Sequence, residues 1–416
     1  MTKRIAAIAF IFICTTIAWA ILGSTIFART YNSDLGLKNK VTSNWGGPQT
    51  QSPPNSCYPE EVTRMVETTE NGKTVSKEVK RWECFNIPLE SSAIDVKFAM
   101  DYRQKGLLWY STYNVDFNGA YGFRNPTAKD RNVDLTFKLP AAQAIYDNLQ
   151  VTMNDQPIAS NVAGDSVHAS ATVPANAQAI FKIGYRSHGL DKWNYSFGAS
   201  DVNQVKDFHL HIATDFADFD FPENTLSPSS KRETANGWQL NWDYSNLVSG
   251  FQVGLEMPQK LQPGPLAGRI SLFAPVSLFF FFFLMFIITT IRGIELHPMN
   301  YFFLATAFFA FHLLLAYLVD HISIHAAFVI CSAVSIFLVV SYLRLVVGGR
   351  FALVEAGITQ FIYLVAFSYA FFFQGFTGLA VTIGAIVTLF VVMQMTGRIK
   401  WAEKFNPTAV PNAVRT

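Results

Sequence analysis

Histidine and aspartate residues in one apolar stretch of the chain are the groups best placed to do chemistry. His312 lies in the middle of a long apolar run, and Asp320, His321 and His325 follow it. Histidine titrates near neutral pH, and polar groups at such positions are often functional. On an ideal helix His312 shares a face with Tyr301, because their separation completes about three turns. These side chains could relay a proton, contact a ligand, or only hydrogen-bond between helices.

The cluster after His312 has some features of a metal site. An aspartate beside two histidines, Asp320, His321 and His325, could ligate a metal, but no further ligand follows at suitable spacing. Helix capping by Asp320 or Ser323 and anchoring of the imidazoles at an interface explain the cluster more simply. We therefore predict no metal site. Glu355 is expected to pair with a cation or to extend to the surface.

Two further pairs occur in the polar middle of the chain. His209 and His211 would lie on one face of a strand, as would Asp218 and Asp220. Neither pair has the additional ligands that a zinc or calcium site requires, so solvated strand faces are expected. The sequence also lacks a nucleophile elbow, a phosphate-binding glycine loop and the HExxH motif. These observations predict that the protein is not an enzyme and uses no cofactor.

Six stretches are long and apolar enough to cross a membrane. A spanning helix needs roughly 20 mostly apolar residues, with every backbone group hydrogen-bonded internally. The predicted spans are residues 5–27, 272–291, 301–319, 326–347, 351–373 and 379–395. They predict an N-terminal transmembrane anchor over residues 1–28 and a five-helix bundle over 270–397, with a tail over 398–416.

The positions of Lys and Arg predict the orientation, because cations in short loops are retained in the cytoplasm. They occur before the first span, after the second, around the turn between the fourth and fifth, and after the sixth: Lys3, Arg4, Arg292, Arg344, Arg350, Arg398, Lys400 and Lys404. Both termini are therefore predicted to be cytoplasmic and residues 29–269 periplasmic. A cleaved signal peptide is the alternative for the first span, but its apolar run exceeds the roughly 7 to 15 residues typical of one.

The region from 29 to 269 is predicted to be a β-rich domain. Its 23 Lys and Arg nearly balance its 26 Asp and Glu, so nothing indicates a nucleic-acid-binding face. Residues 30–93 suggest an irregular region with a hairpin turning at Asn71-Gly72. Alternation with a period of two then recurs over residues 95–100, 108–115, 133–138, 149–153, 166–173, 179–185, 207–213, 238–244 and 250–257. These short strands predict an antiparallel β-sandwich or two small β-modules, with its aromatic residues mostly in the core and a helix only at 140–147.

The four cysteines agree with this topology. Cys14 and Cys331 lie inside predicted spans, where they serve as small packing residues. Cys57 and Cys84 are the pair in the predicted periplasmic domain. In an oxidising compartment such a pair is expected to form a disulfide, and two reduced thiols are the alternative.

Several blocks of sequence resemble a known family. They are His297-Pro298-Met299-Asn300-Tyr301, the leucine-rich segment ending at Asp320-His321, the closing segment 395–401, Trp45-Gly46-Gly47-Pro48-Gln49, and Tyr102-Arg103-Gln104-Lys105-Gly106. Together they resemble the CreD family of inner-membrane proteins, which is associated with cell-envelope integrity. The chain departs from the family pattern at residues 51–56, and it has Asp320 where a glutamate is usual.

The resemblance and the lack of catalytic patterns predict a non-enzymatic bacterial inner-membrane protein that supports envelope integrity or an envelope stress response. Its expected partners are the lipid bilayer and a periplasmic protein or other envelope component. The alternative is a transporter or lipid-handling protein that uses His312 and the lip formed by Asp320, His321 and His325. Against transport, the spans lack paired Gly- or Pro-interrupted helices in matching positions. An enzyme acting at the membrane surface would need an exposed nucleophile and base, which the sequence does not reveal.

Overall fold

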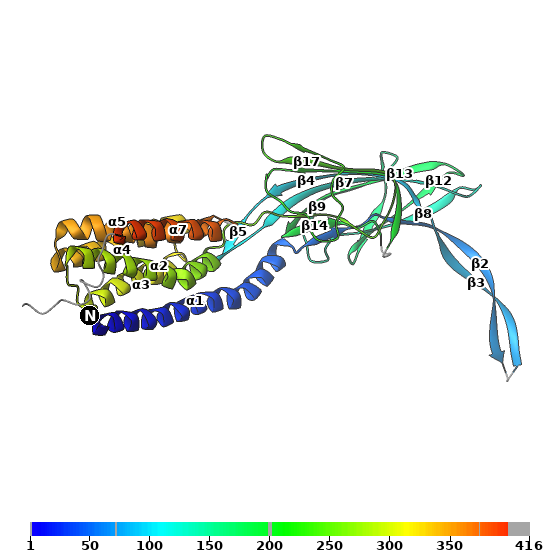
Figure 1. Cartoon of the computed structure of the whole chain (residues 1–416). Coiled ribbons are helices and arrows are strands. Elements are labelled where there is room, and N and C mark those ends of the chain that lie inside the picture. The colour runs from blue at the N-terminus through cyan, green and yellow to red at the C-terminus, as the bar shows by residue number, and fades with distance from the viewer. Residues whose placement is uncertain (1, 71–72, 199–201, 374, 398–416) are drawn as a thin grey trace, which may run out of the picture. The chain divides into compact units, whose positions relative to one another are not determined.

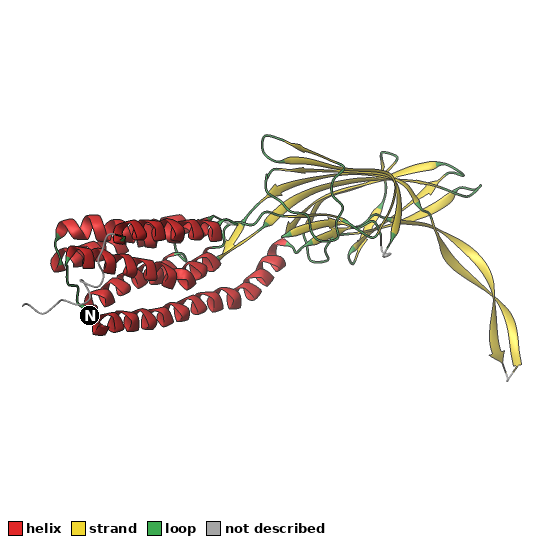
Figure 2. Cartoon of the chain, viewed as in Figure 1, coloured by secondary structure: helices red, strands yellow, loops and turns green. Residues whose placement is uncertain are grey.

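The chain divides into two compact units. The structure is a computed structural model that describes residues 2–70, 73–198, 202–373 and 375–397. The membrane unit comprises residues 1–34, 106–108 and 261–416, and the β-rich unit comprises residues 35–105 and 109–260. Helices and strands are almost fully segregated between the two units (Figures 1 and 2). The predicted boundaries after residues 28 and 269 fall inside the helices α1 and α2.

Six helical spans make up the membrane unit. The first four are α1 (Thr2–Trp45), α2 (Pro263–Arg292), α3 (Pro298–Leu318) and α4 (Ile324–Val346). The fifth joins η1 (Phe351–Ala356), α5 (Gly357–Gln360), η2 (Phe361–Ala366), α6 (Phe367–Tyr369) and η3 (Ala370–Phe372), and the sixth is α7 (Thr377–Thr396). All six are long and apolar enough to cross a membrane, which confirms the six predicted spans.

Helix α1 is much longer than the predicted span. We expected an irregular chain from residue 30, and this prediction is wrong because the helix continues to Trp45. Polar residues after Phe27 end the apolar stretch but do not break a helix, and no proline occurs before Pro48. The helix ends at Gly46, whose φ of 118° is a conformation that glycine adopts readily.

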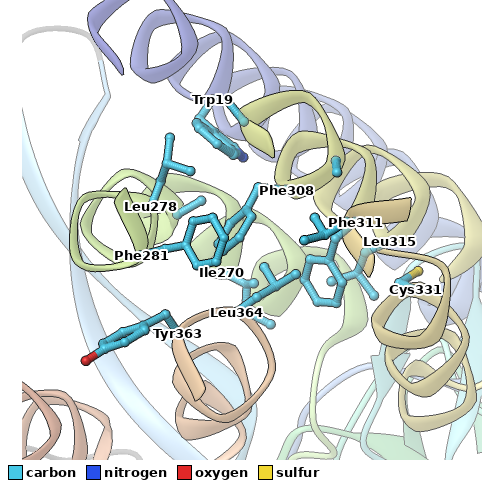
Figure 3. Close-up of a cluster of buried hydrophobic side chains, with 14 of the residues drawn as sticks. Trp19, Ile270, Leu278, Phe281, Phe308, Phe311, Leu315, Cys331, Tyr363 and Leu364 are labelled. Carbon is cyan, nitrogen blue, oxygen red and sulfur yellow. The ribbon is translucent and has the colours of Figure 1, made fainter. Parts of the chain in front are cut away.

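The core of the membrane unit is built from large apolar side chains of α1, α2, α3, α4 and the fifth span. Figure 3 shows Trp19 of α1 near Phe281 of α2 and Phe308 and Phe311 of α3. All four side chains are fully buried. Trp19, Leu22 and Ile26 make α1 part of this core, so the N-terminal helix is a packed component of the unit.

The β-rich unit contains eighteen strands among the described residues, counted with the short β5–β6 ribbon. They are β1 (Gln49–Gln51), β2 (Asn55–Glu70), β3 (Lys73–Asn86), β4 (Leu89–Met100), β5 (Arg103–Lys105), β6 (Leu108–Tyr110), β7 (Thr112–Arg124), β8 (Arg131–Lys138), β9 (Tyr146–Met153), β10 (Gln156–Pro157), β11 (Ser160–Ala163), β12 (Ser166–Val173), β13 (Gln178–Leu190), β14 (Lys192–Tyr195), β15 (Asn203–Thr214), β16 (Ser230–Glu233), β17 (Trp238–Ser249) and β18 (Val253–Glu256). Every predicted period-two segment overlaps one of these strands.

Three larger sheets surround one core. The eight-stranded sheet has the order β10-β9-β13-β7-β4-β15-β17-β16, the five-stranded sheet β11-β12-β8-β2-β3, and the three-stranded sheet β1-β14-β18. Side chains from all three, including Phe117, Phe137 and Trp193, form a single buried cluster, as in a sandwich. Pairing is antiparallel except between β4 and β15 and between β1 and β14, which are parallel.

The segment from 140 to 147 is not the helix that we predicted. It forms bends that lead into β9. The hydroxyl of Tyr146 donates to the carbonyl oxygen of Ala141 at 2.6 Å and accepts from its amide nitrogen at 3.0 Å, which closes the segment as a loop. A few helix-favouring residues after Pro140 are too short a run to nucleate a stable helix.

Strands β2 and β3 form a long two-stranded arm (Figure 1). The expected turn at Asn71-Gly72 lies outside the described residues. The predicted disulfide between Cys57 and Cys84 is confirmed and lies near the base of the arm.

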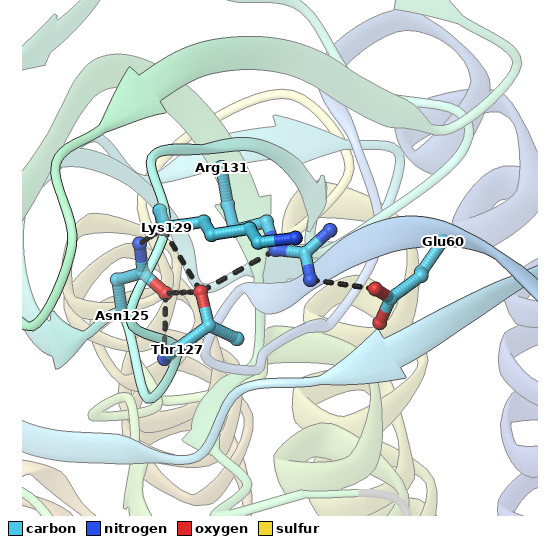
Figure 4. Close-up of polar contacts among 5 residues, drawn as sticks. All are labelled: Glu60, Asn125, Thr127, Lys129 and Arg131. Atoms are coloured by element: carbon cyan, nitrogen blue, oxygen red, sulfur yellow. Dashed lines mark hydrogen bonds and ion pairs between the residues drawn. The ribbon is translucent and has the colours of Figure 1, made fainter.

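The base of the arm is also held by a polar network (Figure 4). Nη2 of Arg131 donates to Oε1 of Glu60 at 2.7 Å, and the Arg131 guanidinium lies 4.8 Å from the centroid of the Tyr58 ring. The fully buried Asn125 side chain donates to the carbonyl oxygens of Lys129 at 2.9 Å and Val173 at 3.0 Å. This network fixes the loop that leads into β8.

Candidate functional site

A polar groove lies on the face of the eight-stranded sheet that points away from the core of the β-rich unit. The open groove, which we call the sheet groove, has a volume of about 500 Å³. Its lining comes from strands β4, β7, β9, β13, β15 and β17. The opposite face of these strands carries Ile94, Ile183 and Leu210 into the core. Alternation along the part of each strand that lines the groove therefore separates a polar groove from a hydrophobic core.

Strand register arranges the groove side chains in two rows across the sheet. One row is Gln150, Gly184, Asn118, Asp95, His211 and Asn241, and the next is Thr152, Lys182, Ala120, Ala93, His209 and Asp243. Small residues in these rows leave room above the sheet. At Gly184 a Cβ atom would lie only 2.6 Å from Oδ1 of Asn118, so a larger residue here would displace the Asn118 side chain.

The two groove histidines are paired with carboxylates. Nδ1 of His209 lies 2.7 Å from Oδ1 of Asp243, and its Nε2 lies 3.2 Å from Oδ1 of Asp207. Nδ1 of His211 lies 2.8 Å from Oδ2 of Asp95. The hydrogen bonds to Asp243 and then Asp207 raise the pKa of His209 above its ordinary value. A histidine that gains positive charge in mildly acidic conditions is therefore part of this surface.

The structure brings together His209 and His211 on one face, as their spacing predicted, but it does not do so for the aspartate pair. Asp218 lies outside any strand, and Asp220 forms only an isolated bridge with Glu256. The prediction of two carboxylates on one strand face is therefore wrong, because the chain leaves the sheet after Thr214. Within the ranges that the structure describes, no group of three or more His, Cys, Asp or Glu side chains could hold a metal ion.

His312 is fully buried in the membrane unit, together with Tyr301. Its ring makes edge contacts with Trp19 and Phe311 at 5.6 Å and 4.8 Å between centroids. Nδ1 lies 2.9 Å from the carbonyl oxygen of Phe308, one turn earlier in α3. Because a carbonyl oxygen can only accept, Nδ1 carries the hydrogen and Nε2 is the acceptor. Among the described residues Nε2 has no partner.

The predicted lip residues do not converge on one point. Asp320 pairs with Arg29 of α1, with Nη1 and Oδ2 3.4 Å apart. Nη2 of Arg29 also donates to the carbonyl oxygen of Ala316 at 2.7 Å. His321 is exposed, and the ring of His325 lies against Phe372 at 5.2 Å between centroids.

Of the two expected caps, Ser323 is the residue that accepts from the amide nitrogen of Ala326. Glu355 forms an ion pair with Arg292, which is one of the two outcomes expected for it from the sequence. The partnership of Arg29 with Asp320 was not foreseen, because Arg29 lies in α1 and Asp320 lies in the turn after α3, far away in the sequence.

A second polar cluster in the membrane unit was also missed. Gln360 is fully buried between two π-helical segments, η1 and η2, and its Nε2 donates to Oγ of Ser335 at 2.8 Å. Ser335 in turn donates to the carbonyl oxygen of Ala307 at 2.7 Å. Interruptions by π-helix often accompany functional positions, but the apolar pattern of the sequence did not reveal them.

The Trp-Gly-Gly-Pro-Gln block after α1 packs against strand β13. The Trp45 ring lies 4.2 Å from the ring of His188, and Nε2 of Gln49 donates to Oγ of Ser187 at 2.9 Å. A Cβ atom at Gly46 would lie 2.4 Å from the carbonyl oxygen of His188, so only glycine fits. The block therefore has a structural role at the point where α1 joins the sheets.

Six apolar helices together with a β-rich unit define a multi-span membrane protein with a folded domain outside the hydrocarbon. The chain belongs to the family of the inner membrane protein CreD, whose model matches residues 1–279 and 252–402. This finding confirms the family resemblance of the sequence blocks and an inner-membrane location. No curated protein matches the chain.

Solved structures give only distant likenesses. A putative nutrient binding protein from Legionella pneumophila has a TM-score of 0.32 and 12% identity, covering 47% of this chain and 71% of that one. An M1 zinc metallopeptidase from Deinococcus radiodurans has a TM-score of 0.25 and 8% identity, covering 40% of this chain and 42% of that one. Likenesses this weak do not bear on function.

Proposed function

We propose that this protein is a non-enzymatic inner-membrane protein that supports cell-envelope integrity, and that its β-rich unit binds an envelope component in the sheet groove. The observation that supports the proposal most directly is the groove itself. A sheet face that is only solvated needs no concavity, whereas here small residues, Ala93, Ala120 and Gly184, leave a hollow rimmed by paired histidines and carboxylates.

The chemistry of the groove suits a polar ligand. Asn118, Gln150 and Asn241 each offer both hydrogen-bond donors and acceptors. Lys182, which is bound to Asp155 at 2.6 Å, adds a cation at one side. A ligand with many hydroxyl or amide groups would match this set, whereas an apolar ligand would leave the groove's polar groups without partners.

The groove can be tested with a matched pair of substitutions on one strand. Ala93 lines the groove, whereas Ala99 lies on the same face of β4 but outside it. We expect Ala93→Arg to abolish rescue of envelope-stress sensitivity in cells lacking the gene, while the protein still inserts at a normal level. Ala99→Arg adds the same charge and size, and it should rescue fully. Full rescue by Ala93→Arg would refute the role of the groove.

The proposed orientation places both termini in the cytoplasm and the β-rich unit in the periplasm. It is supported by the cations at Lys3, Arg4, Arg292, Arg344 and Arg350, because cations beside the ends of spans are retained in the cytoplasm. Reporter fusions near residues 150 and 376 should then report periplasm, and fusions near 296, 348 and 405 should report cytoplasm. A cytoplasmic signal at residue 150 would overturn the arrangement.

Recovery of an intact N-terminus by mass spectrometry would exclude signal-peptide cleavage.

Transport or lipid handling through the bundle is the competing function. The unpartnered Nε2 of the buried His312 is the observation that favours it. Against it, the other ring nitrogen is already bound to a carbonyl oxygen of its own helix, and the ring is enclosed by aromatic side chains. A helical bundle that only anchors the protein in the membrane accounts for these contacts without a moving ligand.

A further inference from the structure

An apolar groove between α1 and α2 has no role in the function proposed above. This α1–α2 groove has a volume of about 300 Å³. Its walls are entirely apolar and include Ile5, Ile8 and Phe12 from α1 and Phe279, Phe282 and Phe286 from α2. Both helices are membrane spans, so the groove opens toward lipid. Hydrocarbon is therefore the matching chemistry for its interior.

Cations stand at one end of this groove. Lys3 and Arg4 directly precede Ile5, the first residue of the wall, and Lys3 is exposed. The guanidinium of Arg4 interacts electrostatically with the hydroxyl of Tyr301. The Tyr301 ring packs at 5.3 Å between centroids against Phe282, which is itself a wall residue. The basic end and the apolar groove are thus parts of one local structure.

At the basic end of the groove, formed by Lys3 and Arg4, two nitrogen atoms lack a hydrogen-bond acceptor in the described part of the chain. Nε and Nη2 of Arg4 are buried and have no hydrogen-bond partner among the described residues. These two nitrogens form one edge of the guanidinium, which matches two oxygens of a phosphate. A buried donor without an acceptor raises the free energy of the protein, so an oxyanion that accepted from these nitrogens would stabilise this end of the groove.

We propose that the α1–α2 groove is a binding site for an anionic phospholipid from the adjacent membrane leaflet. One acyl chain lies along the phenylalanine and isoleucine walls, and the headgroup phosphate is held by Arg4 with Lys3 nearby. A free phosphate ion would match the cations but not the groove. A helix of a partner protein would match the groove but would bring no phosphate to Arg4.

The test uses the full chain in proteoliposomes that contain a trace of phospholipid with a photoreactive group in its acyl chain. The probe is phosphatidylglycerol in one arm and phosphatidylcholine in the other. Crosslinked peptides are mapped by mass spectrometry. We expect phosphatidylglycerol to label residues 5–12 and 279–286 preferentially, at several times the level given by phosphatidylcholine.

Two variants separate the headgroup from the acyl chain. Arg4→Gln should lower phosphatidylglycerol labelling about fivefold, the typical effect of one cation near an anionic lipid. Lys3→Gln removes the same charge from an exposed position and should have a smaller effect. Ala9→Trp fills the groove, whereas Ala6→Trp makes the same change on the exposed surface of α1 outside it. Only Ala9→Trp should abolish labelling by either lipid.

Several outcomes would overturn the proposal. Even labelling of all lipid-facing helices would show that the groove is not a site, and wild-type labelling in Ala9→Trp would show the same. Equal labelling by both lipids, unchanged in Arg4→Gln, would exclude recognition of an anionic headgroup. None of these outcomes affects the sheet groove, which is tested by separate variants in the other unit.

Discussion

The guanidinium carbon of Arg103 lies 3.5 Å from the centroid of the Trp45 ring. The two residues belong to separate blocks that carry the family resemblance, and the structure joins them. The other side of this contact is His188, whose ring lies 4.2 Å from that of Trp45. Arg103, Trp45 and His188 therefore form a cluster where the end of α1 meets strand β13.

We expect this cluster to make the stability of the β-rich unit sensitive to acid. Burial first, and then the charge of Arg103, lower the pKa of His188 below its ordinary value. A lowered folded-state pKa means that stability is lost as the pH falls below the ordinary value of about 6.5. We expect Arg103→Gln to raise the pKa of His188 in an NMR titration of histidine-labelled protein. Arg186→Gln, which removes an exposed ion pair with Asp116, is the control and should leave it unchanged.

His209 in the sheet groove should behave in the opposite way. Its pKa is raised by Asp243 and then by Asp207, so its stabilising pair is fully formed below the ordinary pKa and is lost as the pH rises through the folded-state value. Asp243→Asn should bring the pKa of His209 back toward its ordinary value, and Asp207→Asn should do so by less. The same NMR titration measures both, and an unchanged pKa in Asp243→Asn would contradict the assigned cause.

The disulfide should stabilise the β-rich unit. Cys57 and Cys84 are 27 residues apart, and closing a loop of that size is worth roughly 3 to 4 kcal/mol in the chain-entropy model. We expect Cys57→Ser, or reductant, to lower the free energy of unfolding of this unit by up to that amount, as followed by tryptophan fluorescence in urea. Cys14→Ser removes a free cysteine and should have no effect. Free alkylation of Cys57 and Cys84 without reductant would show that the bond is absent in the cell.

His312→Gln distinguishes an anchor from a transporter. Glutamine retains a donor for the Phe308 carbonyl oxygen but cannot carry a proton. Even hydrogen bonds between helices average only about 0.6 kcal/mol in membranes, and this bond lies within α3, so an anchor should tolerate the change and rescue envelope-stress sensitivity almost fully. Deletion of residues 95–257 should abolish rescue. A His312→Gln protein that inserts normally but has no activity would favour transport.

The six spans and most strands could be predicted from the sequence because each depends on a local pattern. A long run of apolar residues is stable in hydrocarbon whichever segment packs beside it. Alternation along a strand such as β12 indicates directly which face is buried. The disulfide was predictable for a similar reason, since only two cysteines lie between the spans. The errors at 30–45 and 140–147 concern polar or short segments, where local propensity is weak and contacts decide.

The membrane spans and the β-rich domain follow from the order of the residues alone, because hydrophobic length and periodicity are properties of consecutive residues. Which polar residues contact one another depends instead on how the segments pack in three dimensions. His209 was visible as one of a strand pair, but Asp243 reaches it only through the register of β15 and β17. Arg29 and Asp320 are likewise joined only by packing of α1 against α3. Such partnerships depend on distances between segments far apart in the chain, and no local pattern encodes those distances.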